Sequence, residues 1–324
     1  MPTLTFVDAV REGIRAELLA DPSVFVIGED VGTYGGAFRA TRGFLDEFGP
    51  ERIVDTPISE SAIVGAAVGA AMNGLRPVAE MQFIDFLSCA FNQVVNMAAK
   101  ARYRWNAGVP IVVRGPCGGG VHGGPFHSQN VESHYLSTPG LKIVEPATAL
   151  DAYGLMRAAI RDPDPVLFFE HKYLYRRVRD EIPAGEFTVP IGKARIHRDG
   201  TDLSVVTFGA CVHHALEAAD LLAAEGISIE VVDLRTLLPI DEDALLATAR
   251  RTNKVIIYHE AQRTGGIGGE LSAILAERCF DSLDGPVVRV TAPDTPVPFS
   301  PPLEEAYLPG VADLVEAARQ LAAY

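Results

Sequence analysis

Residues 109–129 read VPIVVRGPCGGGVHGGPFHSQ, so a short apolar run passes directly into a glycine-rich loop. A run such as 109–113 is typical of a strand buried on both faces of a parallel sheet. Similar runs lie at 24–27, 141–144 and 166–169. Helix-like stretches between these runs lie at 61–73, 86–103 and 150–160. The alternation predicts an α/β fold, with helices on both faces of a parallel sheet.

A break in this alternation divides the chain. Residues 183–200 contain several prolines and glycines among scattered charges. A second series of strand-like and helix-like stretches then runs from 203 to 323. We therefore expect two parallel-sheet α/β domains, at 1–182 and 201–324, joined by a linker at 183–200 that holds a strand or two. Five prolines between 293 and 302 predict an extended connection before a last helix at 311–323.

Composition excludes several classes of protein. The chain has 28 basic and 42 acidic residues, a formal net charge of −14, which disfavours binding to a nucleic-acid backbone. Its longest uncharged apolar stretch, 61–75, is too short to span a bilayer. The first 20 residues carry three acids and no apolar signal core, and the four cysteines form no CxxC pair. We expect a cytoplasmic protein with free thiols that binds neither nucleic acid nor a membrane.

Glu60 is a first candidate catalytic residue. It ends the segment DTPISE at 55–60 and precedes a predicted helix, so we expect it at a strand-to-helix turn, where ligands of parallel sheets usually bind. The following helix carries Gly65 and Gly69 four residues apart, which permits a close helix crossing, within the chain or between subunits. In a purely structural interpretation, Glu60 is a first-turn acid favoured by the helix dipole.

The glycine-rich loop admits several interpretations. Gly118, Gly120 and Gly123 match the dinucleotide fingerprint, and Glu145 lies about 20 residues further on, as that fingerprint requires. The fingerprint also needs a helix that opens at the glycines, which the sequence at 121–125 does not favour. A nicotinamide dehydrogenase that uses this loop is therefore a rival hypothesis.

Histidines in the same loop suggest other chemistry. Cys117, His122 and His127 could ligate a metal, although their spacing fits no zinc pattern. Alternatively, the loop lines a site in which one histidine acts as acid, base or hydrogen-bond donor. A plain glycine-rich loop with surface histidines is the structural alternative. The pair His259 and Glu260, expected at a strand end before two glycines, could be a site or an ordinary turn.

Three segments together resemble the beta chain of the thiamine-diphosphate-dependent decarboxylase component of 2-oxo acid dehydrogenase complexes. They are DTPISE at 55–60, RPVAEMQF at 76–83 and FHSQ at 126–129. The resemblance runs nearly end to end and includes PGLKIV at 139–144, DLRT at 233–236 and APDTP at 292–296. It implies a transketolase-like pyrimidine-binding domain followed by a transketolase C-terminal-like domain.

The resemblance also implies an active site. Glu60 would bond N1′ of the cofactor's aminopyrimidine and favour the imino tautomer, whose nitrogen can take the proton from C2 of the thiazolium. Ile58, Gln82 and Phe86 would lie against the pyrimidine; branched-chain members often have tyrosine where Phe86 stands. His127 matches the family's active-site histidine, which would steer protons while the acyl group moves to a lipoyl arm.

A structural potassium site is implied as well. The matching positions, which offer mostly backbone oxygens, are Ile111, Ala159, Ile160, Asp162 and Asp164. Members of the family often carry asparagine at the last of these positions. Asp164 adds a charge there, which leaves the identity of the cation open.

One absence bears on assembly. Thiamine enzymes of this superfamily hold the diphosphate and Mg²⁺ through a Gly-Asp-Gly motif, and the chain contains none. The resemblance implies that an alpha subunit supplies these functions in a heterotetramer of two alpha and two beta chains. It also implies that a lipoylated acyltransferase core docks through a small basic subunit-binding domain, for which the free carboxylate of Tyr324 is a natural anchor.

The substrate is less closely defined. The segments at 126–129 and 80–82 favour a branched-chain 2-oxo acid, whereas those at 118–122 and 292–295 also resemble pyruvate members. Acetoin-cleaving complexes share most of these motifs. A non-catalytic assembly subunit is a rival of another class, which the presence of Glu60 and His127 disfavours.

Overall fold

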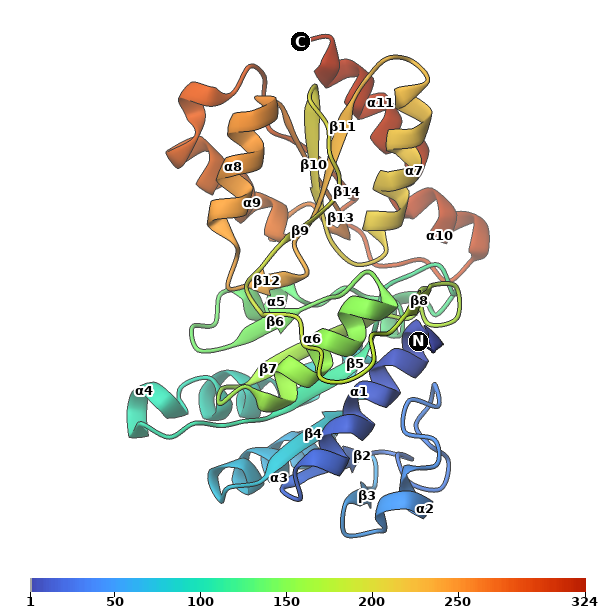
Figure 1. Ribbon diagram of the computed structural model, residues 1–324, viewed down its shortest axis with the longest axis vertical. Helices are drawn as coiled ribbons and strands as arrows, with labels where there is room; N and C mark the ends of the chain where they lie inside the picture. The colour runs from blue at the N-terminus through green and yellow to red at the C-terminus, as the bar shows by residue number, and fades with distance from the viewer. Residues whose placement is uncertain (1) are drawn as a thin grey trace. The chain divides into compact units, whose positions relative to one another are not determined.

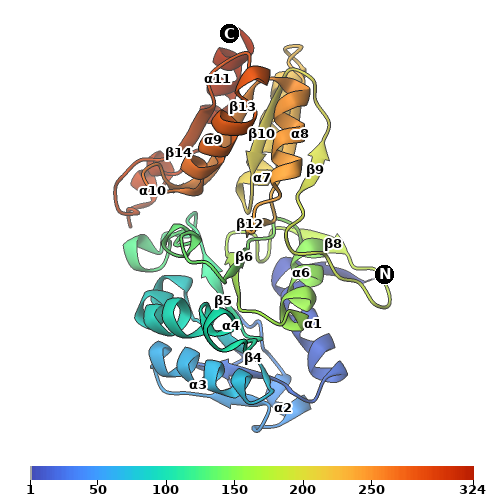
Figure 2. The same ribbon diagram turned by 90° about the vertical axis from the view of Figure 1, so that its left-hand side faces the viewer.

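The computed structural model describes residues 2–324, which form two compact units. The first contains the chain up to Cys117 and residues 134–191, and the second contains Gly118–Ser133 and Gly192–Tyr324. The glycine-rich loop therefore belongs to the second unit, although the sequence on both sides of it belongs to the first. Figures 1 and 2 show the elements of each unit.

The first unit is built on a parallel sheet in which six strands follow the order β6-β7-β5-β4-β2-β3. These strands are β2 (Val24–Gly28), β3 (Ile53–Asp55), β4 (Arg76–Glu80), β5 (Val112–Cys117), β6 (Lys142–Val144) and β7 (Val166–His171). A separate antiparallel pair joins β1 (Thr3–Thr5) to β8 (Arg179–Glu181). The α-helices of this part of the chain are α1 (Phe6–Ala20), α2 (Phe44–Phe48), α3 (Glu60–Met72), α4 (Ala101–Trp105), α5 (Ser133–Leu136) and α6 (Ala149–Arg161).

Capping residues define where the two long packed helices of this unit begin. The hydroxyl of Thr5 accepts a hydrogen bond from the Asp8 N–H at 3.2 Å, and Thr148 caps α6 in the same way. α1 packs against α6, and α3 packs against the segment 84–98 (Figure 2). A buried ion pair between Arg157 and Glu17, 2.7 Å apart, ties α6 to α1.

The second unit contains a five-stranded sheet in the order β14-β13-β10-β11-β9, in which only β9 is antiparallel to its neighbour. Its strands are β9 (Arg195–Arg198), β10 (Leu203–Thr207), β11 (Ile229–Asp233), β13 (Val255–Gln262) and β14 (Val288–Ala292), and β12 (Thr236–Leu238) is a further short strand. Its helices are α7 (Cys211–Ala223), α8 (Glu242–Thr252), α9 (Ile267–Arg278), α10 (Pro301–Tyr307) and α11 (Val311–Ala322). α7 and α11 cover one face of the sheet, and α8 and α9 cover the other (Figure 1).

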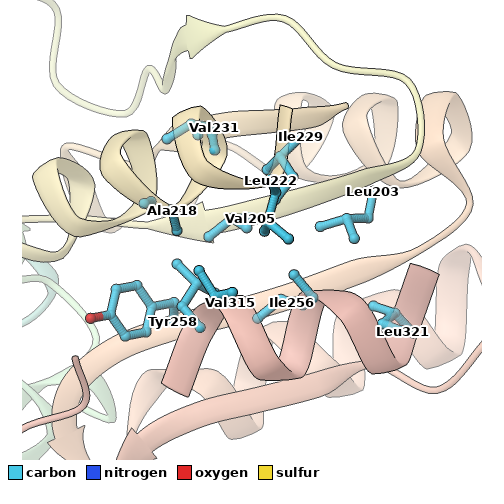
Figure 3. Packing of buried hydrophobic residues seen from close by; sticks show 14 of the residues in the cluster. Leu203, Val205, Ala218, Leu222, Ile229, Val231, Ile256, Tyr258, Val315 and Leu321 are labelled. Carbon is cyan, nitrogen blue, oxygen red and sulfur yellow. The ribbon is translucent and has the colours of Figure 1, made fainter. Parts of the chain in front are cut away.

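The core of the second unit lies between the sheet and the pair α7 and α11. Val205 and Ile256 from the sheet, Leu222 from α7, and Val315 and Leu321 from α11 are buried together (Figure 3). Fully burying aliphatic side chains of this size contributes about 1.5–3 kcal/mol each. This packing holds the strand ends, and the loops that follow them, in fixed positions.

The parallel-sheet α/β architecture predicted from the sequence is confirmed in both units. Four local predictions were wrong. The single helix expected at 86–103 is a 3₁₀ segment at Ile84–Ala90, a π-helical segment at Gln93–Ala98 and then α4. The strand expected at 109–113 is β5, shifted to Val112–Cys117, and β13 continues through His259 and Glu260.

The fourth difference lies in the proline-rich connection before the last helix, which was predicted to be wholly extended. Helix α10 begins there at Pro301, because proline is tolerated in the first helical turn, where its missing N–H would have no partner. None of the helices within residues 2–324 has the length and apolar character needed to cross a bilayer.

Candidate active site

Glu60 lies at the carboxyl edge of the first sheet. There β2, β3 and β4 end at Gly28, Asp55 and Glu80, which stand in register with one another. Glu60 is the first residue of α3 and is partly buried. The strand-to-helix turn predicted for Glu60 is confirmed, so its carboxylate lies where parallel sheets bind their ligands.

Further acids surround this turn. Glu29, only 5% exposed, accepts a hydrogen bond from the Ser59 N–H at 3.3 Å. Burial raises the pKa of Glu29, and the charge of nearby Glu60 raises it further. Asp55 accepts a hydrogen bond from the Gly32 N–H at 2.6 Å, which holds the loop after β2 against the end of β3. The edge is therefore acidic and suited to a ligand that carries nitrogen donors.

The predicted pyrimidine contacts lie in the same unit. Ile58 precedes Glu60 by two residues and exposes 82% of its surface, which is unusual for an isoleucine in a loop of an ordered domain. Gln82 follows β4 and donates from Nε2 to Asp30 Oδ2 at 3.1 Å. Phe86 packs edge-on against Phe83, with ring centroids 6.1 Å apart. An exposed apolar side chain, an amide and an aromatic ring thus accompany the acids.

A buried charge network behind this edge was missed by the sequence analysis. Arg114 on β5 donates from Nε and Nη2 to the two carboxylate oxygens of Glu170 at 2.5 and 2.6 Å, and also pairs with Glu80. Tyr175 donates its hydroxyl to Glu170 at 2.7 Å. Burial, with the charge of Glu170, raises the pKa of Glu80 to about 7. The sequence did carry a signal for this network, because Arg114, Glu80 and Glu170 are charged residues within or at the ends of otherwise apolar strands.

His127 lies in the second unit, in the glycine-rich loop. The loop is closed by the Gly118 N–H, which donates to Gln129 O at 3.1 Å. Only a three-residue 3₁₀ turn, Gly124–Phe126, forms within it. The loop therefore lacks the helix that a dinucleotide fingerprint requires, and the nicotinamide hypothesis loses its structural basis. His127 itself is partly buried beside fully buried Ser128.

The residues of the predicted cation site cluster in the first unit, but their oxygens already have protein donors. Arg76 donates from Nη1 to the carbonyls of Ile160 and Asp162 at 2.9 and 3.1 Å. The side chain of Asp162 accepts two hydrogen bonds from Lys142 Nζ at 2.7 and 2.6 Å. Asp164 Oδ1 accepts a hydrogen bond from Arg102 Nε at 2.5 Å.

The remaining predicted ligands share this feature. The Ile111 carbonyl accepts from the Val166 N–H at 3.0 Å, and the Ala159 carbonyl accepts from the Asp162 N–H at 3.2 Å. Each carbonyl keeps a second lone pair, so these residues fit a cation that shares the oxygens with existing donors. A cation bound there would lie close to the positive charges of Lys142 and Arg76, which would repel it.

Family models match both parts of the chain. Residues 3–178 match the transketolase pyrimidine-binding domain, and residues 192–314 match the transketolase C-terminal domain. The two predicted domain types and their order are therefore confirmed. The chain is a transketolase-like protein.

Curated relatives narrow the class. A 2-oxoisovalerate dehydrogenase subunit beta from Bacillus subtilis is 50% identical over 328 residues and covers 100% of both chains. Pyruvate dehydrogenase E1 component subunits beta from Bacillus subtilis and Staphylococcus aureus are 46% and 42% identical, each covering 99% of both chains. The chain belongs to the family of beta subunits of 2-oxo acid dehydrogenase E1 components, as its motifs predicted.

A solved structure agrees on the fold. It is entitled "Split gene transketolase, inactive beta4 tetramer", with a TM-score of 0.82 and 24% identity, and the match covers 99% of this chain and 98% of the other. At that identity the match supports the fold alone.

Proposed function

We propose that this chain is the beta subunit of a thiamine-diphosphate-dependent 2-oxo acid dehydrogenase component, with a branched-chain 2-oxo acid as substrate. The reaction is the oxidative decarboxylation of that acid, with transfer of the acyl group to a lipoyl domain. The observation that carries the proposal is the 50% identity, over the full length, to a 2-oxoisovalerate dehydrogenase beta subunit. The position of Glu60 at the carboxyl edge of the first sheet supports it.

Glu60, Ile58, Gln82 and Phe86 would hold the aminopyrimidine of the cofactor. When bound, thiamine diphosphate supplies a nucleophilic carbon and an electron sink for decarboxylation. With the cofactor bound, the Glu60 carboxylate would accept a hydrogen bond at N1′ and favour a proton on that ring nitrogen rather than on the exocyclic nitrogen. Ile58 and Phe86 provide apolar contact that excludes water from this hydrogen bond.

His127 would act in the later acyl-transfer step. A histidine side chain can donate a proton, which suits the protonation of a lipoyl sulfur as the dithiolane ring opens, and His127 is partly buried. Glu60 and His127 are thus assigned separate tasks: Glu60 acts on the cofactor, and His127 acts on the transfer of the acyl group.

An alpha subunit would complete the site. Because the chain has no Gly-Asp-Gly motif, it lacks the usual means of holding the diphosphate and Mg²⁺. We assign both to an alpha chain, in a heterotetramer of two alpha and two beta subunits in the cytoplasm. A lipoylated acyltransferase core is the expected further partner. The domain boundaries proposed for the beta chain are 1–182 and 201–324, with the linker at 183–200.

A structural K⁺ is proposed at Ile160 and Asp162, with Ile111, Ala159 and Asp164 as further ligands. The match of these positions to the family's pattern supports the proposal, and the backbone carbonyls keep a second lone pair for a cation. The test is thermal unfolding of the assembled complex in KCl and in NaCl at equal ionic strength. K⁺ should raise the midpoint in the wild type, and Asp162→Asn should reduce the difference. Equal unfolding midpoints in the two salts would show that no K⁺ binds at these residues.

Pyruvate is the second candidate substrate, favoured by the 46% identity to a pyruvate dehydrogenase E1 beta subunit. The deciding experiment uses the complex assembled with its alpha subunit, and 2-oxoisovalerate, pyruvate and acetoin are compared with an artificial electron acceptor. The proposal requires the highest kcat/KM for 2-oxoisovalerate. A higher kcat/KM for pyruvate or acetoin would identify that compound as the substrate instead. No turnover with any of the three would favour a non-catalytic assembly role for the chain.

A further inference from the structure

Three hydrogen bonds within the glycine-rich loop, donated by the N–H groups of Gly118, Gly123 and His127, hold part of its shape. Its backbone adopts positive φ at Gly118, Gly120, Gly124 and His122. Glycine loses more conformational freedom on folding than any other residue, so a loop this rich in glycine is costly to order. Its apolar side chains do not anchor it either, because the one at Phe126 is 68% exposed. The loop therefore needs partners outside itself.

Glu260 holds both ends of the loop with one carboxylate oxygen. This oxygen, Oε1, accepts from the Gly119 N–H at 2.6 Å and from Asn130 Nδ2 at 2.8 Å. Gly119 precedes His127 by eight residues and Asn130 follows it by three. Glu260 lies near the end of β13, at an irregularity between the residues His259 and Gln262, which pair with β14 on either side of it.

Glu304 on α10 holds the middle of the loop. Its carboxylate is 1% exposed, accepts from the His122 N–H at 3.0 Å and lies 2.6 Å from His122 Nδ1. The ring of Phe299 lies against Gly124, where any side chain would collide with it. The second unit thus supports the loop at its two ends and at its centre.

A third carboxyl group close to the loop is costly to bury. Glu132, at the end of the loop, is fully buried, and neither of its carboxylate oxygens hydrogen-bonds to another residue among those described. Burial raises the pKa of Glu132 to about 7, and the charge of Glu260 raises it further. Burial also raises the pKa of Tyr307 to about 12, with a contribution from the charge of Glu260. An apolar contact would hold the loop at less cost, but it would not fix the direction of backbone N–H groups.

We propose that Glu260 and Glu304 are positioning residues that clamp the loop 118–130 and thereby fix the place of His127. The inference rests on the proposed function of His127 in acyl transfer. Neither glutamate is assigned contact with substrate or cofactor; each acts through the backbone of the loop.

The test compares Glu260→Ala and Glu304→Ala with the matched control Glu305→Ala, since Glu305 is the exposed neighbour of Glu304. All are assembled with the alpha subunit. Hydrogen exchange in peptides that cover 118–130 should accelerate in the first two variants and stay unchanged in the control. The rate of lipoyl acylation should fall about 10- to 100-fold, because small displacements of an acid–base group are costly. The KM for the 2-oxo acid with an artificial acceptor should not change.

Two further variants distinguish loss of the clamp from unfolding of the protein. Glu260→Gln keeps an acceptor oxygen and should restore slow exchange and most of the acylation rate. Asn130→Ala removes one of the two bonds to Glu260 without removing a buried acid, and it should reproduce part of the loss. If hydrogen exchange at 118–130 in Glu260→Ala is as slow as in the wild type, the clamp does not exist. If Glu260→Ala does not assemble, the same result in Asn130→Ala would overturn the clamp.

A double-mutant cycle separates positioning from a general structural effect. If Glu260 acts through His127, the losses of Glu260→Ala and His127→Ala will not add in the double variant. Additive losses would contradict the proposal. If His127→Ala alone acylates lipoyl groups at the wild-type rate, the proposed role of His127 fails, and hydrogen exchange still decides whether the clamp exists.

Discussion

The carboxylate of Glu29 lies next to Glu60, and it accepts a hydrogen bond from the residue that precedes Glu60 in the chain, Ser59, at 3.3 Å. Burial and the charge of Glu60 both raise the pKa of Glu29, so the neighbouring acid holds a proton more readily than an exposed glutamate does. Glu60 therefore stands at the start of α3 beside a second, buried carboxyl group. The task that we assign to Glu60 is to accept a hydrogen bond from a ring nitrogen.

Glu60→Gln should therefore abolish most of the activity of the assembled complex. The amide keeps the shape of the side chain but cannot stabilise a proton on N1′, and the loss of such a role costs about 10²–10⁴-fold in rate. Decarboxylation with an artificial acceptor measures the effect, and gel filtration checks that assembly is intact. Glu51→Gln, an exposed residue of the same unit, is the control. Near-normal turnover in Glu60→Gln would refute the assigned role.

Thiamine diphosphate should bind weakly to the isolated beta chain and tightly to the chain assembled with its alpha subunit. We assign the pyrimidine contacts to Glu60 and Gln82, whereas the chain has no Gly-Asp-Gly motif for the diphosphate. Isothermal titration calorimetry with Mg²⁺ present measures both affinities. Tight binding by the isolated chain would show that the chain holds the diphosphate by itself.

Glu132→Gln should stabilise the protein at pH 8 and leave it unchanged below pH 4.5. Because the pKa of Glu132 is raised from 4.5 to about 7 on folding, the folded state binds more protons than the unfolded state between these values. Stability must then fall as the pH rises through this window, by up to about 3 kcal/mol for one such group. The amide variant does not titrate, so its unfolding midpoint should exceed that of the wild type by several degrees at pH 8.

The control for this experiment is Glu305→Gln, an exposed acid of the same unit. Its unfolding midpoint should follow that of the wild type across the pH range. Parallel pH profiles for wild type and Glu132→Gln would mean that Glu132 does not carry the raised pKa.

Sequence patterns predicted the elements that are repeated and locally encoded. Apolar runs such as 166–169 fell in buried strands, and the turn before Glu60 was placed correctly because strand, proline and helix signals coincide there. The segment at 84–98 was misjudged as a regular helix. Its apolar spacing is helical, but packing against α3 selects 3₁₀ and π geometry, which propensity alone does not encode.

Contacts distant in sequence could not be predicted in the same way. The bond between Gly119 and Glu260 joins residues 141 positions apart, and nothing local to either one indicates the other. His259 and Glu260 were expected at a strand end, where a turn or a site was equally plausible; β13 continues past them to Gln262, and Glu260 meets the glycine-rich loop. The loop differs from its surroundings in composition, which the sequence shows directly, whereas its attachment to the second unit required the fold.

Arg114→Met should destabilise the first unit by about 3–5 kcal/mol, because the substitution leaves two buried carboxylates, Glu80 and Glu170, without their shared counter-charge. Urea unfolding measures the loss. Arg114→Met combined with Glu170→Gln should recover part of it, since one of the two uncompensated charges is then removed. A double variant no more stable than the single one would show that geometry, rather than charge, maintains the network. Arg102→Met, at a partly exposed ion pair with Asp164, should cost less than about 1 kcal/mol.

The carboxyl terminus should contribute to docking on the acyltransferase core. Tyr324 is 76% exposed, yet its position is defined: its N–H donates to Leu321 O at 3.2 Å, and its ring lies beside Gly285. It lines a groove of about 590 Å³ with Phe280, Leu283 and Asp284 among the other walls. An exposed tyrosine ring and a nearby aspartate suit a small basic domain, and the net charge of −14 would accelerate its approach.

Deletion of Ala323 and Tyr324 should therefore leave decarboxylation with an artificial acceptor intact, because neither residue lies at the carboxyl edge of the first sheet. Affinity for the core and overall NADH formation should fall, since the ring of Tyr324 no longer lines the groove. Surface plasmon resonance at several ionic strengths measures the affinity. Tyr324→Phe is the matched control: it keeps the ring and the terminal carboxylate and should bind like the wild type. If the deletion binds the core at low salt as tightly as the intact chain does, docking must use another surface.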